Sequence, residues 1–170
     1  MWEEVLAWEA LYGRQWDGVV VAVNDVGCHW PRDLHHWVSL HPEKLVGWAA
    51  LRAQYRHPSG YVTWGRAGRP CDRHVKAWAG GSSGMYGVQV AQVVGCSRVV
   101  LCGIPMTAAA HFAESTVHVL RQPWTAVAGH WRAWEAQGYR MQGWAKSMSG
   151  RSQEMLGAPT LDWLYGPSAV

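Results

Sequence analysis

The sequence predicts an α/β fold of Rossmann type, with about five mainly parallel strands and helices on both faces of the sheet. Two observations predict this class. Continuous β-branched runs, such as GVVVAVN at 18–24, are typical of strands buried on both faces. Segments with apolar residues at helical spacing separate these runs, and parallel strands need such crossovers. The length of 170 residues fits one domain, which we place at 1–150 and expect to be followed by a C-terminal helix and tail at 151–170.

The first half of the chain alternates between helix and strand. Apolar residues recur at helical spacing from residue 2 until Gly13 ends the pattern. A second helix begins with a proline in its first turn and Glu43 near its positive end, and His57 and Pro58 terminate it. The elements expected here are helices over 2–12 and 42–56 and strands at 18–24, 36–40 and 61–65.

The second half contains a glycine-rich turn, GGSSG, that precedes a helix. A hydrophobic strand follows, and residues 106–122 then show no clear period. The expected elements are a polar loop over 66–79, the turn at 80–84 with its helix, a strand at 98–102, a helix over 123–138 and a last strand at 139–144.

Composition excludes several classes of protein. No run of about 18 apolar residues could span a membrane. The net charge of +3 is modest and the 12 arginines are spread along the chain, so we predict no nucleic-acid binding. The first residues include acids where a secretory signal would have lysine or arginine. Four well-separated cysteines without a CxxC pair indicate reduced thiols. We therefore expect a cytoplasmic protein.

Ligands of parallel α/β proteins bind beyond the carboxyl ends of the strands. The GGSSG turn fits an anion site, because small residues allow close approach and the helix start offers free N–H groups. The alternative is a tight turn capped by serine. The candidate ligand-binding residues are Asn24, Asp25, His41, Ser82, Ser83, Gly84 and Met106.

No metal site or cofactor is predicted. The nine histidines form no HxxxH or HExxH pair on an expected helix, and no DxD triad is present. The glycine-rich turn is followed by no GK[ST], and it lacks the first-strand setting of a GxGxxG dinucleotide turn.

The segment GGSSGMYGVQVAQVVGCSRVVLCGIPM resembles a region of the bacterial sialyltransferases of glycosyltransferase family 42 and of related flagellin-modifying glycosyltransferase domains. In that family a small-residue [ST]SG turn, an aromatic residue, a helix and a strand ending in G-I occur in this order. VVVAVND resembles the family's second strand with its asparagine. The resemblance spans about residues 1–150. It implies a metal-independent transferase that binds a nucleotide sugar, with Asn24 on the nucleotide or donor sugar and the turn of Ser82, Ser83 and Gly84 near the donor.

The sequence departs from that family in two ways. The family's first strand and its G-x-G-P-S nucleotide turn have no counterpart before the helix at 2–12, so we expect another element or a partner chain to pair with the strand at 18–24. The family also has a catalytic histidine after the G-I strand. His111, His118 and His130 lie in that region, none with a matching motif; His111 is the first candidate for the base and His130 the second.

Three functions remain open from the sequence. The chain is a small glycosyltransferase, a non-catalytic binding or assembly protein on a transferase scaffold, or an unrelated α/β enzyme. Thirteen tryptophans against one phenylalanine also favour an oligomer or a protein partner, because tryptophan is enriched at interfaces.

Overall fold

A computed structural model describes residues 1–78, 82–107 and 124–166 of the chain. The chain divides into two compact units: unit 1 is formed by Met1–Asp17 and Ser97–Val170, and unit 2 by Gly18–Cys96. Both units are mixed α/β, and their strands pair in parallel, which is compatible with a Rossmann-like fold. Within the described residues, no helix has the length and apolar character needed to span a membrane.

Unit 2 is built on a four-stranded sheet whose spatial order follows the sequence, β1-β2-β3-β4. All neighbouring strands are parallel, and Val23 pairs with Val38, which pairs with Trp64. Such pairing requires crossover segments, which contain helices between β1 and β2 and between β2 and β3, whereas a loop joins β3 to β4. The strands are β1 (Val21–Val23), β2 (His36–Val38), β3 (Val62–Gly65) and β4 (Arg73–His74).

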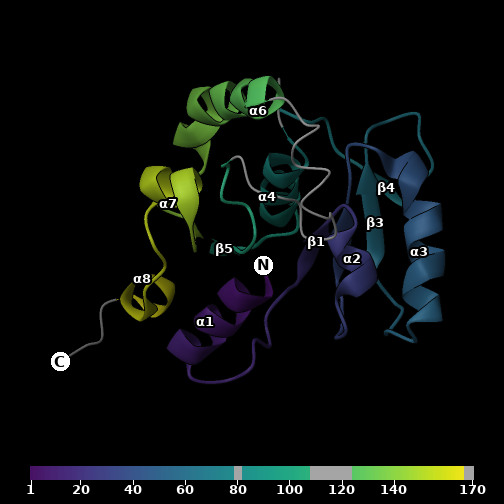
Figure 1. Cartoon of the computed structure of the whole chain (residues 1–170), viewed down its shortest axis with the longest axis horizontal. Coiled ribbons are helices and arrows are strands. Elements are labelled where there is room, and N and C mark those ends of the chain that lie inside the picture. The colour runs from purple at the N-terminus through teal and green to yellow at the C-terminus, as the bar shows by residue number, and fades with distance from the viewer. Residues whose placement is uncertain (79–81, 108–123, 167–170) are drawn as a thin grey trace. The chain divides into compact units, whose positions relative to one another are not determined.

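Helices cover both faces of this sheet (Figure 1). On α4 (Ser83–Val93), Gly87 approaches β1 and β2 so closely that a Cβ there would lie 2.8 Å from Val23 Cγ2 and 3.4 Å from Val38 Cγ2. On α2 (Val26–His29), Gly27 packs in the same way against the Trp37 ring. Because consecutive residues of a strand point to opposite faces, Trp37 and Val38 place α2 and α4 on opposite sides.

The 3-10 helix η1 (Pro42–Lys44) leads into α3 (Leu45–Gln54), which packs against α2. A buried guanidinium joins these two helices, since Arg52 is only 1% exposed. Arg52 donates hydrogen bonds to the carbonyls of Gly27, Trp30, Arg32 and Pro58. Burial lowers the pKa of Arg52, yet the four carbonyl partners replace the water that the side chain lost.

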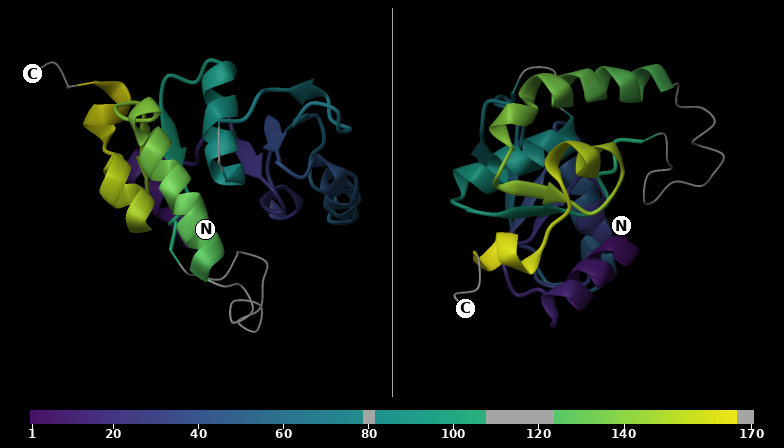
Figure 2. Two further views of the ribbon diagram at one scale, coloured as in Figure 1. Left: turned by 90° about the horizontal axis from the view of Figure 1, so that it is seen from above. Right: turned by 90° about the vertical axis from the view of Figure 1, so that its left-hand side faces the viewer.

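Unit 1 has a second parallel sheet, formed by β5 (Val99–Leu101) and β6 (Ala145–Ser147). In the right-hand view of Figure 2, β6 lies beside β5 and leads into α7. The helices of this unit are α1 (Trp2–Tyr12), α6 (Trp124–Gln137), η2 (Gly138–Arg140), α7 (Gly150–Leu156) and α8 (Leu161–Tyr165). Trp8, Trp131 and Trp134 of this unit are buried, whereas Trp2 is half-buried.

Within unit 1, Glu4 of α1 joins the ends of both strands. Its carboxylate accepts hydrogen bonds from the Gly103 N–H and the Ser149 hydroxyl, each at 2.7 Å. Gly103 follows β5 and Ser149 follows β6, so α1 is fastened at the carboxyl edge of this small sheet. These hydrogen bonds explain why Glu4, a charged residue, lies next to the buried residues Val5 and Trp8 in α1.

The strand predictions are partly wrong. The described residues contain six strands in two sheets instead of five, and the expected strand at 139–144 is instead η2 followed by turns. The last strand is β6, which consists of small and polar residues and lacks a hydrophobic run. β4 lies in the stretch expected to be loop, and both of its residues are exposed. Neither β4 nor β6 has the β-branched pattern on which the prediction relied.

Candidate functional site

The carboxyl edge of the four-stranded sheet brings together most of the predicted site residues of unit 2. Asn24 directly follows β1, and His41 lies three residues after β2. Parallel strands end at one edge of a sheet, and ligands of such sheets bind there. This edge is therefore the candidate functional site.

A buried serine connects the segments after β1 and β2. Ser39 is 0% exposed, and its hydroxyl donates to Asn24 Oδ1 and accepts from the His41 N–H, both at 2.9 Å. The Ser39 N–H in turn donates to the Trp64 carbonyl of β3 at 3.0 Å. Ser39 thus fixes the ends of three neighbouring strands relative to one another.

Asn24 is held by its backbone as well as by Ser39. Its N–H donates to the Val38 carbonyl at 2.9 Å, and its carbonyl accepts from Trp37 Nε1. Its φ of 54° lies in the left-handed region, which asparagine adopts more readily than most residues. Among the described residues, none accepts a hydrogen bond from Asn24 Nδ2, so this amide is available to a ligand.

The start of α4 lies at the same edge. The Tyr86 hydroxyl donates to the carbonyl of Gly65, the last residue of β3, at 2.7 Å. Ser82 caps the helix, its Oγ accepting from the Met85 N–H at 3.4 Å. Ser83 and Gly84 form the first helical positions and are half-buried. The capping predicted for GGSSG is thus present, on a helix whose N-terminus meets the carboxyl ends of the strands.

His41 and Glu43 form an exposed pair, with His41 Nδ1 3.3 Å from Glu43 Oε1. Their side chains are 57% and 45% exposed. A hydrogen bond from its own backbone N–H lowers the pKa of the Glu43 carboxyl, and His41 and Arg69 lower it further. Glu43 therefore stays ionised beside His41 Nδ1, on a histidine side chain that is largely exposed.

Of the remaining predicted residues, Asp25 lies beside Asn24 at the same edge, between β1 and α2. Asp25 is half-buried at the start of α2 without a side-chain capping bond, and its carbonyl accepts from the Cys28 N–H. Met106 and His130 belong to unit 1, where Met106 is half-buried and His130 is exposed on α6. His111 is outside the described residues. The predicted residues at this edge of unit 2 are therefore Asn24, Asp25, His41 and the turn at 82–84.

Sequence reasoning missed Lys44, Arg66 and Arg69 at this edge, and it selected the segment from Ser39 to Glu43 without giving Ser39 or Glu43 a role. Ser39 and Glu43 lie next to the chosen His41, but only the strand register shows that Ser39 reaches Asn24. Arg66 and Arg69 directly follow β3. Ligands bind beyond the carboxyl ends of parallel strands, and this rule selected Asn24. It applies equally to Arg66 and Arg69, which were overlooked because residues 66–79 were expected to be only a polar loop.

In the described part of the chain, no group of three or more His, Cys, Asp or Glu side chains is arranged to hold a metal ion. Comparison of the sequence and structure with protein-family models, curated proteins and solved structures gives no match. The function is therefore inferred from the chemistry of the carboxyl edge.

Proposed function

We propose that this chain is a metal-independent, glycosyltransferase-like protein that binds a nucleotide sugar at the carboxyl edge of the four-stranded sheet. One observation supports this most: Asn24, the Ser39–His41 segment and the start of α4 meet at that edge. The free side-chain amide of Asn24 can donate a hydrogen bond to a base or to a sugar hydroxyl. The first N–H groups of α4, an 11-residue helix, favour binding of an anion. The sequence resemblance to glycosyltransferase family 42 suggests a nucleotide sugar as that ligand.

In this proposal the residues have distinct roles. Asn24 contacts the nucleotide or donor sugar, and the N–H groups at Ser83 and Gly84 face the phosphate. Glycosyl transfer also needs a base for the proton of the acceptor hydroxyl, and histidine suits neutral pH. His111 is the first candidate and His130 the second. Donor hydrolysis that is lost in His111→Ala would support the assignment, and hydrolysis at the wild-type rate would remove it.

Binding is tested by titrating uridine and cytidine nucleotides while recording tryptophan fluorescence, since Trp37 and Trp64 lie in the strands that form the edge. We expect a saturable change that weakens about tenfold when Ser82→Ala and Ser83→Ala are combined, because the helix start loses its cap and its hydroxyls. Ser59→Ala is the matched control, at an exposed position in the loop before β3. A wild-type protein that shows no response at millimolar nucleotide would overturn the proposal.

A second candidate function is non-catalytic binding or assembly. The observation that favours it is the position of β1, which has β2 as its one neighbour in the sheet of unit 2. A strand at a sheet edge presents backbone groups that can pair with another chain. An assembly protein would associate without hydrolysing or transferring a donor sugar.

We also propose that the protein works in the cytoplasm. Cys28, Cys71, Cys96 and Cys102 are all free thiols, and reduced cysteines are typical of that compartment. Burial raises the pKa of Cys28 to about 11 and that of Cys102 to about 12, so both thiols should be inert at neutral pH. Four thiols titrating with Ellman's reagent after denaturation of protein purified without reductant would agree with this proposal.

A further inference from the structure

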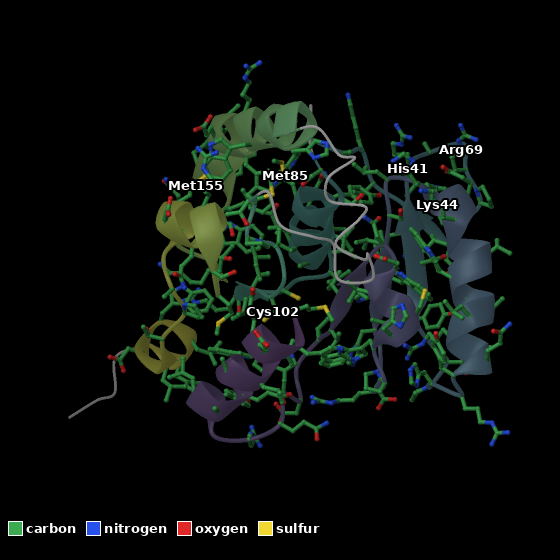
Figure 3. All side chains as sticks on the ribbon, in the orientation of Figure 1. His41, Lys44, Arg69, Met85, Cys102 and Met155 are labelled. Carbon is green, nitrogen blue, oxygen red and sulfur yellow. The ribbon has the colours of Figure 1, made fainter. Side chains whose placement is uncertain are left out.

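Cys71, in the loop after β3, and His74, the last residue of β4, form a thiol–imidazole pair. Cys71 Sγ lies 3.2 Å from His74 Nδ1, which is the reach of a nucleophile and its base. The sulfur is also 3.7 Å from the Arg69 carbonyl oxygen, and Figure 3 shows Arg69 at the same end of unit 2 as His41. The pair therefore lies at the carboxyl edge of the four-stranded sheet.

The neighbouring strand β3 holds this pair in place. Gly65 of β3 pairs with His74 in the parallel register. Asp72, between the two residues of the pair, accepts hydrogen bonds from the N–H and the hydroxyl of Thr63 and donates its own N–H to that hydroxyl. The sulfur also packs on β3, since a Cβ at Gly65 would lie 3.1 Å from Cys71 Sγ. The sheet therefore fixes the backbone on both sides of the thiol–imidazole contact.

Cys71 differs from the other three cysteines in having this base. Burial raises the pKa of Cys28 to about 11 and that of Cys102 to about 12. Cys96 is half-buried, as Cys71 is, but in the part of the chain that the structure describes its thiol has no hydrogen-bonding partner. Burial raises the pKa of Cys71 as well, so its sulfur is protonated at neutral pH and needs a base in order to react. The exposed imidazole of His74 is that base, and small reagents can reach it.

We propose that Cys71 is a site of reversible modification by small disulfides, with His74 as the base that activates its thiol. His74 Nδ1 takes the thiol proton as Cys71 Sγ attacks one sulfur of the disulfide. A new S–S bond forms to Cys71 and the S–S bond of the reagent breaks. The electron pair of the broken bond leaves with the other sulfur, which receives the proton from His74. One protein thiol is thereby oxidised to a mixed disulfide, and half of the reagent is reduced to a thiol.

The exchange runs in both directions. When a small thiol in excess attacks the mixed disulfide, Cys71 is the leaving sulfur, and the proton on His74 neutralises it. The same imidazole therefore accelerates the forward and the reverse step. None of these steps involves a nucleotide sugar, so the modification of Cys71 is independent of the proposed function.

The test measures how fast each cysteine of the folded protein reacts with hydroxyethyl disulfide, an uncharged reagent, by acid quenching and mass spectrometry of proteolytic peptides. We expect Cys71 to react about tenfold or more faster than Cys96, the internal control in the same molecule. His74→Gln keeps a polar side chain but removes the base, so it should lower the Cys71 rate to that of Cys96 and leave the Cys96 rate unchanged. Arg73→Gln is the matched control, because it removes an exposed charge next to His74 in β4 and leaves the pair in place. It should slow Cys71 far less.

Two results would overturn the proposal: a Cys71 rate no greater than that of Cys96, and a fast Cys71 rate that persists in His74→Gln. Should His74→Gln fail to unfold cooperatively, His74→Ala provides a second comparison, with imidazole added to the buffer as a free base. Added imidazole should then raise the Cys71 rate and leave the Cys96 rate unchanged. A Cys71 rate that does not respond to imidazole, or that rises only in step with Cys96, removes the role given to His74.

Discussion

The hydroxyl of Ser39 donates a hydrogen bond to Asn24 Oδ1 at 2.9 Å, although the two residues follow different strands. The same hydroxyl accepts from the His41 N–H, so one buried oxygen fixes both the amide of Asn24 and the backbone of the histidine segment. A buried polar group is stable only when its partners are present. Ser39 therefore links the stability of the sheet edge to the geometry of the candidate site.

Replacing Ser39 with alanine should affect both stability and binding. The substitution leaves Asn24 Oδ1 and the His41 N–H without their buried partner, at an expected cost of about 1–2 kcal/mol in the free energy of unfolding. The freed Asn24 side chain should also weaken nucleotide binding several-fold. Denaturant unfolding and the fluorescence titration measure the two effects, with Ser59→Ala as control. An unchanged midpoint and unchanged affinity would contradict the role given to Ser39.

The sequence allowed much of this edge to be predicted, for a physical reason. Runs of β-branched and aromatic residues marked β1, β2, β3 and β5, and the end of a parallel strand is where ligands bind. Asn24 follows from that rule, and the turn at 82–84 follows from its small residues and the helix start behind it. β6 was not predicted because its residues, Ala145–Ser147, are small or polar and give no hydrophobic pattern in the sequence. Ala145 and Ser147 are nevertheless buried, because other parts of the fold pack against them.

The hydrogen bonds could not be predicted in the same way. The contact between Ser39 and Asn24 depends on the register of β1 and β2, which one sequence does not specify. Arg52 is a similar case: a charged residue in a helix ordinarily faces water, whereas here carbonyls from 22 and 25 residues upstream surround it.

Arg52 gives the strongest stability prediction. Arg52→Lys keeps the charge but cannot reach carbonyls on both helix α2 and the segment before β3, so buried carbonyls lose their donors. We expect unfolding to become easier by about 3 kcal/mol, as for other broken buried networks. Arg56→Lys, an exposed arginine just after α3, should change stability by less than about 0.5 kcal/mol. Urea denaturation measures both, and equal midpoints would contradict the buried network.

Asp72 predicts an acid-dependent contribution to stability. Thr63 donates from its N–H at 2.8 Å and its hydroxyl at 2.7 Å to Asp72 Oδ2, and these bonds, the backbone one first, lower the pKa of the carboxyl. A lowered folded-state pKa stabilises the fold above the unfolded pKa of about 3.9. The contribution is lost as pH falls through the lower, folded value.

The Asp72→Asn variant should therefore show a flatter stability profile below about pH 4 than the wild type, with little difference in slope at neutral pH. Carbon-detected NMR titration of the carboxyl groups gives the pKa directly. Asp33→Asn serves as control, since the Asp33 side chain is exposed and makes no hydrogen bond in the described residues. A pKa of Asp72 at or above the ordinary aspartate value would contradict the prediction.

Self-association is the last prediction, and it follows from the register of β1. Alternate residues of a parallel strand bond to each neighbour. The carbonyl of Val20 and the N–H of Asn24 bond toward β2, so the backbone groups of Val21 and Val23 point to the other side. Light scattering at tens of micromolar should give a mass above that of one chain. Val21→Pro removes an outward N–H at the first position of the strand, where proline is tolerated, and should lower the mass to that of a monomer while unfolding stays cooperative. A monomeric wild type would reject association through this edge.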